Sequence, residues 1–344
     1  MGQTVPPHFV RHVAALALAI AAGAAALRVP LGVWRRLALP LWCGCVALLA
    51  LTLVFGVHVN GARCWLRVGG INLQAAELAK WTGVLAAAAV LARSGPGAPR
   101  LPALVRCLGL LALPVFLLLL QPDLGSAAIL VALMAVLLFV AGTPLRFFAA
   151  PGGVALLGLA AYVALRPYAL ARWRGFLAPW QTAREEGFQL VQSFVAFGRG
   201  GLFGVGLGDG RQKLFYLPEA HTDFILSVVA EELGLAGVLL VLGAFAAFTL
   251  AGLRIAARAR DPFSLLVAVG MTSLIAVPAA VNAAVVMGLL PTTGFTLPFL
   301  SFGSNSLLVC GLAVGVLMRV AARDDAALPV VRGVGGRSRA GVVR

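Results

Sequence analysis

Apolar residues dominate nine stretches of the chain, and short polar segments separate most of them. Runs of about twenty apolar residues are typical of membrane-spanning helices, because a helix of that length crosses the hydrocarbon core of a bilayer. We predict spans at 9–27, 37–56, 76–93, 101–120, 125–142, 149–166, 223–252, 262–289 and 303–322. The third is the weakest, because Glu77 and Lys80 lie in its first turn. The pattern predicts an all-α, polytopic membrane protein.

Two longer polar segments complete this pattern. The first, 167–222, lies between the sixth and seventh spans, and we interpret it as one long loop. The second, 324–344, is rich in glycine and arginine and is predicted to be a disordered basic tail. We therefore expect one membrane domain over 1–323, followed by that tail.

The basic residues predict the orientation of the spans. Loops on one side of the predicted membrane, together with the tail, hold most of the arginines, among them Arg28, Arg35, Arg36, Arg93, Arg100, Arg106, Arg146, Arg254, Arg258, Arg260, Arg319 and Arg323. Outside the long loop, the opposite side holds only Arg11, Arg63, Arg67 and Lys80. By the positive-inside rule the arginine-rich side is cytoplasmic, so the loop 167–222 is external.

Composition and charge fit this interpretation. The chain is 61% hydrophobic, its mean hydropathy is +0.99, and its net charge is +15. In a soluble protein such a charge would indicate nucleic-acid binding. Here the excess of basic residues on the cytoplasmic side, together with their attraction to anionic lipid headgroups, explains the charge, so we predict no nucleic-acid partner. The five cysteines show no CxxC or zinc spacing, so neither a disulfide framework nor a metal site is implied.

Candidate chemistry is concentrated in the segment 212–225, where two carboxylates, an imidazole and a lysine directly precede an apolar run. An acid at the mouth of a membrane helix is costly to desolvate, which favours a functional explanation. A simple helix start is the alternative, with Thr222 as the capping residue and Asp223 favoured by the first-turn dipole.

More ionisable residues are predicted at the same outer face. The acids and bases are Asp123, Glu219, His221 and Asp223, and the anion binders are Arg63, Arg67, Lys80, Arg172, Arg174, Arg211 and Lys213. Arginine forks and lysine charges suit a pyrophosphate, and a buried carboxylate could remove a proton from a sugar hydroxyl. No hydrolase, zinc-protease or NTPase motif is present. Because ATP is absent outside the cell, synthesis there requires a substrate that is already activated, such as a lipid-linked pyrophosphate sugar.

Several motifs then point to a known family. They are Asn60-Gly61-Ala62-Arg63-x-Trp65, Gln121-Pro122-Asp123-x-Gly125, Gln189-x-x-Gln192-Ser193, Gly204-x-Gly206-x-Gly208, the segment 212–225, Glu231-Glu232-Leu233-Gly234 and Gly294-x-Thr296-Leu297-Pro298-Phe299-x-Ser301-x-Gly303. In order and spacing the chain, from about residue 8 to residue 323, resembles the SEDS family (shape, elongation, division and sporulation) of polytopic peptidoglycan glycosyltransferases. The forms of the 212–225 and 294–303 motifs are more similar to the cell-division member than to the elongation member.

The resemblance implies a reaction on lipid II, in which undecaprenyl pyrophosphate leaves and the anomeric configuration inverts. It implies that Asp223 is the catalytic base and that Glu219 is the second catalytic candidate, placed to orient Asp223 or the acceptor. The candidates for substrate binding are Arg63, Lys80, Asp123, Arg211, Lys213, His221 and Ser301.

Some of these residues have structural alternatives. Lys80 could pair with Glu77, three residues earlier on a helix. Asp123 follows a proline in a tight turn and could be structural, and His221 could serve packing or hydrogen bonding. Glu231 and Glu232 lie about two turns inside their predicted helix, which indicates a functional or interhelical polar contact whose partner the sequence does not reveal.

The resemblance also implies partners and a location: a class B penicillin-binding transpeptidase and other divisome membrane proteins, at the division septum of a bacterial cytoplasmic membrane. No cofactor is identified, although a Mg²⁺ or Mn²⁺ ion at the pyrophosphate stays open. A lipid II flippase and a non-catalytic division scaffold are the rival functions.

Three features depart from the family pattern. The family has ten spans, and our nine correspond to its second to tenth, which indicates either a misassigned start or a lost helix. Ala75-Ala76 replaces Pro-Ser, and Thr293 stands where the family has lysine. Ser304-Asn305 stands in place of a Gly/Ser pair. Because these positions lie near the outer face, altered activity is an open question.

Overall fold

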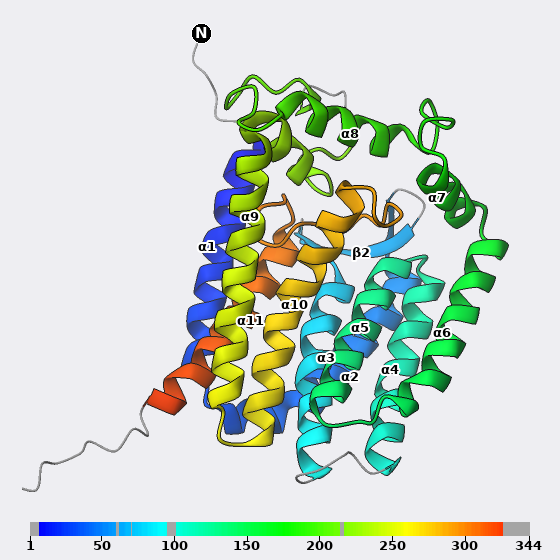
Figure 1. Cartoon of the computed structure of the whole chain (residues 1–344). Coiled ribbons are helices and arrows are strands. Elements are labelled where there is room, and N and C mark those ends of the chain that lie inside the picture. The colour runs from blue at the N-terminus through cyan, green and yellow to red at the C-terminus, as the bar shows by residue number, and fades with distance from the viewer. Residues whose placement is uncertain (1–6, 60–61, 70, 95–100, 214–216, 326–344) are drawn as a thin grey trace, which may run out of the picture.

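The computed structural model describes residues 7–59, 62–69, 71–94, 101–213 and 217–325 (Figure 1). Each of the nine predicted spans coincides with a helix in this part of the chain. These helices are α1 (Pro7–Arg28), α2 (Leu31–Phe55), α3 (Ala75–Leu91), α4 (Leu101–Leu120), α5 (Leu124–Val140), α6 (Arg146–Leu165), α9 (Ile225–Arg258), α10 (Pro262–Val286) and α11 (Ser304–Asp325). The helical class and the polytopic membrane architecture are thereby confirmed.

Six of these helices are long and apolar enough to cross a membrane, namely α1, α2, α6, α9, α10 and α11. The apolar parts of α4 and α5 span 17 residues each, and α3 is also 17 residues long. The exact number of spans therefore stays a prediction.

Helix α3 lies at the centre of the helical bundle. Nearly every residue from Ala75 to Leu91 is buried, including the run Ala86–Ala89, whose small side chains let neighbouring helices approach closely. α10 packs on it where Gly270 faces Val84; a Cβ at Gly270 would lie 2.3 Å from the Val84 side chain. In contrast, α6 buries none of its residues and stands at the edge of the bundle (Figure 1), as expected of a helix surrounded by lipid.

A small antiparallel sheet above α3 was not predicted. Its strands β1 (Val57–Val59), β2 (Ala62–Val68) and β3 (Ile71–Leu73) pair in that order, with Leu66 opposite Leu73. The sequence does carry hairpin signals, Asn60-Gly61 and Gly69-Gly70, among residues of β-strand propensity. The sheet places Trp65, Arg67 and Asn72 over the outer ends of the membrane helices.

The segment 167–222 is also more ordered than the predicted loop. It contains two helices, α7 (Pro167–Leu177) and α8 (Phe188–Gly200), which lie across the top of the bundle in Figure 1. Pro167 occupies the first position of α7, where its missing N–H costs nothing. α8 is amphipathic and buries Leu190, Val191 and Ala196.

Candidate active site

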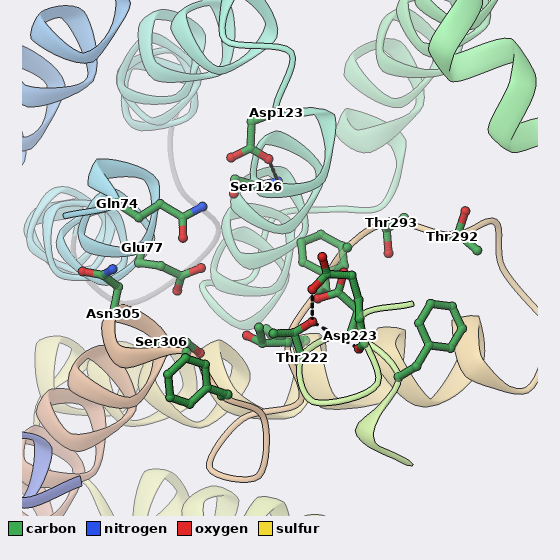
Figure 2. A pocket seen from close by; sticks show the side chains of 18 of the residues that line it. Gln74, Glu77, Asp123, Ser126, Thr222, Asp223, Thr292, Thr293, Asn305 and Ser306 are labelled. Carbon is green, nitrogen blue, oxygen red and sulfur yellow. Dashed lines mark hydrogen bonds between the residues drawn. The ribbon is translucent and has the colours of Figure 1, made fainter. Parts of the chain in front are cut away.

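A cavity of about 940 Å³ opens among the outer ends of the helices. Its walls come from the sheet, the first two turns of α3 and α11, the start of α5, the helices α7, α8 and α10, and the two segments 218–224 and 292–303. Figure 2 shows Gln74 and Glu77 on one side of this pocket, Thr222 and Asp223 on the other, and Asp123 with Ser126 at a third side. Residues from most parts of the sequence therefore converge on one polar chamber.

Asp223 lies in the wall of this cavity, two residues before α9 begins. Its side chain is half-buried, and its pKa is raised to about 6. Burial is the largest cause and the nearby carboxylate of Glu219 adds to it, while the guanidinium of Arg172 opposes both effects. A carboxylate with a pKa near 6 is a suitable general base close to neutral pH.

Hydrogen bonds from other segments hold the backbone around Asp223 in place. Asn282, near the C-terminal end of α10, donates from Nδ2 to the carbonyl oxygens of Asp223 (2.7 Å) and Phe295 (2.6 Å). Ser301 donates from Oγ to the carbonyl oxygen of Thr222 (2.5 Å) and accepts from the Leu297 N–H (2.7 Å). The base is thus tied to α10 and to the 292–303 segment at once.

Asn282 was not among our candidates, although the sequence contains a signal for it. It is the kind of polar residue inside an apolar span that is costly unless it has partners, and it is 1% exposed. Ser301 was predicted to bind substrate, but the structure places it behind the cavity wall, with its hydroxyl engaged by backbone groups. We interpret it as a residue that positions the Asp223 segment.

Replacing Asn282 with leucine should therefore slow catalysis more than it weakens substrate binding. Loss of both hydrogen bonds frees the Asp223 backbone, and a misplacement of about 1 Å can cost about a hundredfold in rate. We expect kcat for glycan polymerisation to fall about 10- to 100-fold, with a small change in KM. Thr272→Val is the matched control, since the Thr272 hydroxyl bonds only within α10, to the Ala268 carbonyl. A change in KM alone would contradict the positioning role.

Glu219 lies in the same cavity wall in a left-handed backbone conformation, with φ of 57°. Its Oε2 accepts a hydrogen bond from the Thr222 hydroxyl (2.7 Å), and its carbonyl accepts from the Thr222 and Phe224 N–H groups. Thr222 does not cap α9: the N-cap is Phe224, and no side chain bonds there. The helix-start alternative for Thr222 is therefore wrong, and the 219–224 turn serves to present two carboxyl groups to the cavity.

Asp123 and Lys80 line the opposite part of the cavity, and both show their predicted structural contacts. Asp123 caps α5 by accepting the Ser126 N–H (2.9 Å), while its Oδ2 is buried without a hydrogen-bond partner in the described part of the chain. Burial raises the pKa of Asp123 above its usual value. Lys80 pairs with Glu77 at 2.6 Å. Both residues line the cavity wall, and their binding roles stay predictions.

Arg172, one of the predicted anion binders of the outer face, is a cation of this cavity, although it was not among our candidates for substrate binding. It projects from α7, lies over the Tyr168 ring at 4.6 Å, and donates from Nη1 to the Thr292 carbonyl (2.9 Å). Arg67, from β2, is a second lining cation. α7 was not predicted as a helix, so nothing in the sequence could place Arg172 beside Asp223.

Besides Ser301, four more predicted binding residues do not line this cavity. Arg63 and Arg211 are exposed elsewhere. Lys213 donates to Glu232 (2.6 Å) and to the Gly208 carbonyl (2.6 Å). The side chain of His221 is exposed, and its carbonyl accepts the Phe302 N–H. These side chains therefore lie outside this cavity, and their roles in substrate binding stay predictions.

The structure shows the hydrogen-bond partners of Glu231 and Glu232. Glu231 is fully buried and accepts from Arg199 (2.7 Å) and from the N–H groups of Arg211 and Gln212. Gly234, with φ of 66°, breaks α9 just beyond, and the glycine-rich segment 200–213 wraps around this break. The two glutamates therefore organise the external segment and do not reach the cavity.

The substitutions that depart from the family pattern have definite places in the structure. Ala75 and Ala76 are buried at the start of α3, and Thr293 lines the cavity with its hydroxyl buried and without a partner in the described ranges. Asn305 also lines the cavity and donates to the Asn72 carbonyl (2.8 Å). The substitutions at Thr293 and Asn305 thus change the chamber directly.

Comparison with known proteins places this geometry in a family. Residues 2–326 match the FTSW/RODA/SPOVE model, described as a cell cycle protein. The chain is 42% identical over 301 residues to a probable peptidoglycan glycosyltransferase FtsW of Geobacter sp. (strain M18), covering 87% of this chain and 82% of that protein. For the protein of the same name from Trichlorobacter lovleyi, the identity is 44% over 303 residues, with 86% and 78% covered.

Solved structures give the same result. One, of a peptidoglycan synthase complex in which polymerization and crosslinking are coordinated, matches with a TM-score of 0.78 and 30% identity over 93% of this chain and 90% of that one. The rod shape determining protein RodA of Thermus thermophilus matches with a TM-score of 0.68 and 29% identity, covering 92% and 89%.

Proposed function

Since the chain belongs to the FtsW/RodA/SpoVE family of cell cycle proteins and is a peptidoglycan glycosyltransferase, we propose that it polymerises lipid II with Asp223 as general base. The observation that carries this proposal is the placement of Asp223: half-buried in the wall of a large outer cavity, with its pKa raised to about 6.

In the proposed step, the 4-hydroxyl of the acceptor GlcNAc attacks C1 of the donor MurNAc. The hydroxyl proton passes to Asp223, the bond from C1 to the pyrophosphate oxygen breaks, and undecaprenyl pyrophosphate leaves with that electron pair. The α-linked donor becomes a β-1,4 glycan. Pyrophosphate is a good leaving group, so the cavity has to supply only a base, orientation and charge stabilisation.

The cations that line the cavity would stabilise the pyrophosphate. They are Arg67, Lys80 and Arg172. The charge of Arg172 lowers the pKa of Asp223. The acids of the lining, Glu77, Asp123, Glu185, Glu186, Glu219 and Asp223, outnumber them. Among the described residues, no group of three or more His, Cys, Asp or Glu side chains could hold a metal ion. A Mg²⁺ or Mn²⁺ ion would therefore depend on phosphate oxygens for its ligands, and we assign no step to it.

The pH dependence of polymerisation tests the role of Asp223. A base must be deprotonated, so the rate should fall about tenfold per pH unit below about pH 6 and level off above it. Glu219→Gln removes a negative neighbour, lowers the pKa of Asp223 and should move this limb to lower pH. Arg172→Gln removes a positive neighbour and should move it to higher pH. pH–rate profiles on purified lipid II provide the measurement; unshifted limbs in both variants would contradict the assignment.

We propose that the protein works in the bacterial cytoplasmic membrane at the division septum, beside a class B penicillin-binding transpeptidase and other divisome membrane proteins. The membrane helices support the first part, and the similarity to a chain of a peptidoglycan synthase complex supports a transpeptidase partner. Septal location rests on the similarity to relatives named FtsW. Co-purification with the cognate transpeptidase tests the partnership.

A further inference from the structure

A second cavity, of about 520 Å³, lies at the other end of the helical bundle. It is formed where the turn between α1 and α2 meets the start of α10 and the last turns of α11. Its lining residues are Pro30, Leu31, Gly32, Arg35, Asp261, Phe263 and Arg319. On α11, Ser306 lines the outer cavity and Arg319 lines this one, 13 residues or about 20 Å along the helix. The arginine bias of the loops places this end in the cytoplasm.

Two arginines give this cavity its chemistry. The Nε–H of Arg319 is buried and has no hydrogen-bond partner within the described ranges. A buried donor left without an acceptor is costly, so this group favours an acceptor that arrives from outside. The guanidinium of Arg35 stands over the Phe263 ring, 5.8 Å from its centroid, on the exposed side of the cavity. Guanidinium groups in such a pair suit an anion with several oxygens.

The acid of the cavity is engaged in capping. Asp261 is the N-cap of α10 and accepts from the Ser264 N–H (3.1 Å) and the Ser264 hydroxyl (2.6 Å). With one carboxylate against two guanidiniums, the lining keeps a positive charge. The N-terminus of α10, which begins at Pro262, adds a favourable dipole for an anion.

The remaining lining is apolar. Pro30, Gly32 and the buried side chains of Leu31 and Phe263, 3% and 2% exposed, make up this part. A cationic recess at the ends of membrane helices, with apolar residues in its lining, matches a lipid whose headgroup is anionic and whose chains lie along the helices. Anionic lipids of the cytoplasmic leaflet are attracted to such basic sites.

We propose that this cavity binds the phosphodiester headgroup of an anionic phospholipid of the cytoplasmic leaflet, with Arg319 and Arg35 on the phosphate oxygens. The site is separate from the reaction at the outer face, so it does not depend on the proposed function. Bound lipid would join α2, α10 and α11 at their cytoplasmic ends.

Lipid titration of the purified full-length protein tests this proposal. Native mass spectrometry would compare phosphatidylglycerol with phosphatidylcholine for the native chain, Arg319→Gln, Arg35→Gln and Arg36→Gln. Arg36 is the matched control, an exposed arginine next in sequence that does not line the cavity. We expect selective binding of phosphatidylglycerol, weakened by about tenfold or more in the first two variants, the loss typical of a charged hydrogen bond, and unchanged in Arg36→Gln.

Three results would overturn the proposal: equal binding of the two lipids, unchanged binding in Arg35→Gln, or equal loss in Arg36→Gln. Arg35→Gln keeps the test valid if Arg319→Gln fails to fold, because Arg35 is exposed. A competition arm with soluble glycerol 3-phosphate separates the two sources of phosphate. Displacement of the lipid by that compound at comparable concentration would indicate a site for free phosphate esters and would also overturn the lipid assignment.

Discussion

Asp223→Asn is expected to lower the rate of glycan polymerisation by about 10²- to 10⁴-fold, the usual contribution of a general base. Asparagine keeps the size of the side chain and leaves the hydrogen bond from Asn282 to the residue 223 carbonyl in place, so the protein should fold and insert normally. What it removes is the group that accepts the proton of the acceptor hydroxyl. Gel separation of glycan strands made from purified lipid II measures the effect.

Asp209→Asn is the control for that variant. Asp209 is also an external aspartate, but it is exposed in the glycine-rich segment and does not line the cavity. It should polymerise lipid II at the native rate. An equal loss of activity in both variants would show that a general loss of external charge, and not a specific base, is responsible.

Glu231→Ala is expected to cause the largest loss of stability, about 2–4 kcal/mol in the free energy of unfolding. The substitution removes the acceptor of three donors at once: the Arg199 guanidinium and the N–H groups of Arg211 and Gln212. The estimate is kept below that for a fully buried ion pair, because the Arg199 side chain is 35% exposed. Thermal unfolding and limited proteolysis of the 200–213 segment measure the loss.

Two further variants separate the causes. Glu231→Gln keeps an acceptor for the backbone N–H groups and should lie between the native protein and the alanine variant. Glu232→Ala removes a more exposed acid, 12% exposed and paired with Lys213, and should cost less. If Glu231→Ala and Glu232→Ala were equally stable, the buried acid would not organise the external segment.

The membrane architecture could be predicted from the sequence because hydropathy acts locally. Inside a bilayer each apolar run has to satisfy its backbone hydrogen bonds within its own helix, so the run itself marks the helix. The nine predicted ranges coincide with helices. The positions of α7 and α8 could not be found in this way. They lie outside the apolar runs, where length and hydropathy no longer decide the structure.

The candidate site was predictable only in part. The segment containing Glu219 and Asp223 stood out because carboxylates beside a membrane span are costly. Which cations accompany them depends on contacts between distant segments: Arg172 reaches the cavity from α7, whereas Lys213, close to Asp223 in sequence, pairs with Glu232. Asn282 shows the same limit, because its two acceptors lie 59 and 13 residues away along the chain.

Polymerisation of purified lipid II by the native protein and by Asp223→Asn, each with and without the cognate transpeptidase, tests whether Asp223 is the base. Binding of lipid II is measured in the same samples. We expect both proteins to bind lipid II and only the native protein to make glycan strands. Strands made by a folded Asp223→Asn protein at the native rate would contradict the role of Asp223 as base. Transport of labelled lipid II across proteoliposomes without any polymer from the native protein would contradict the glycosyltransferase reaction itself.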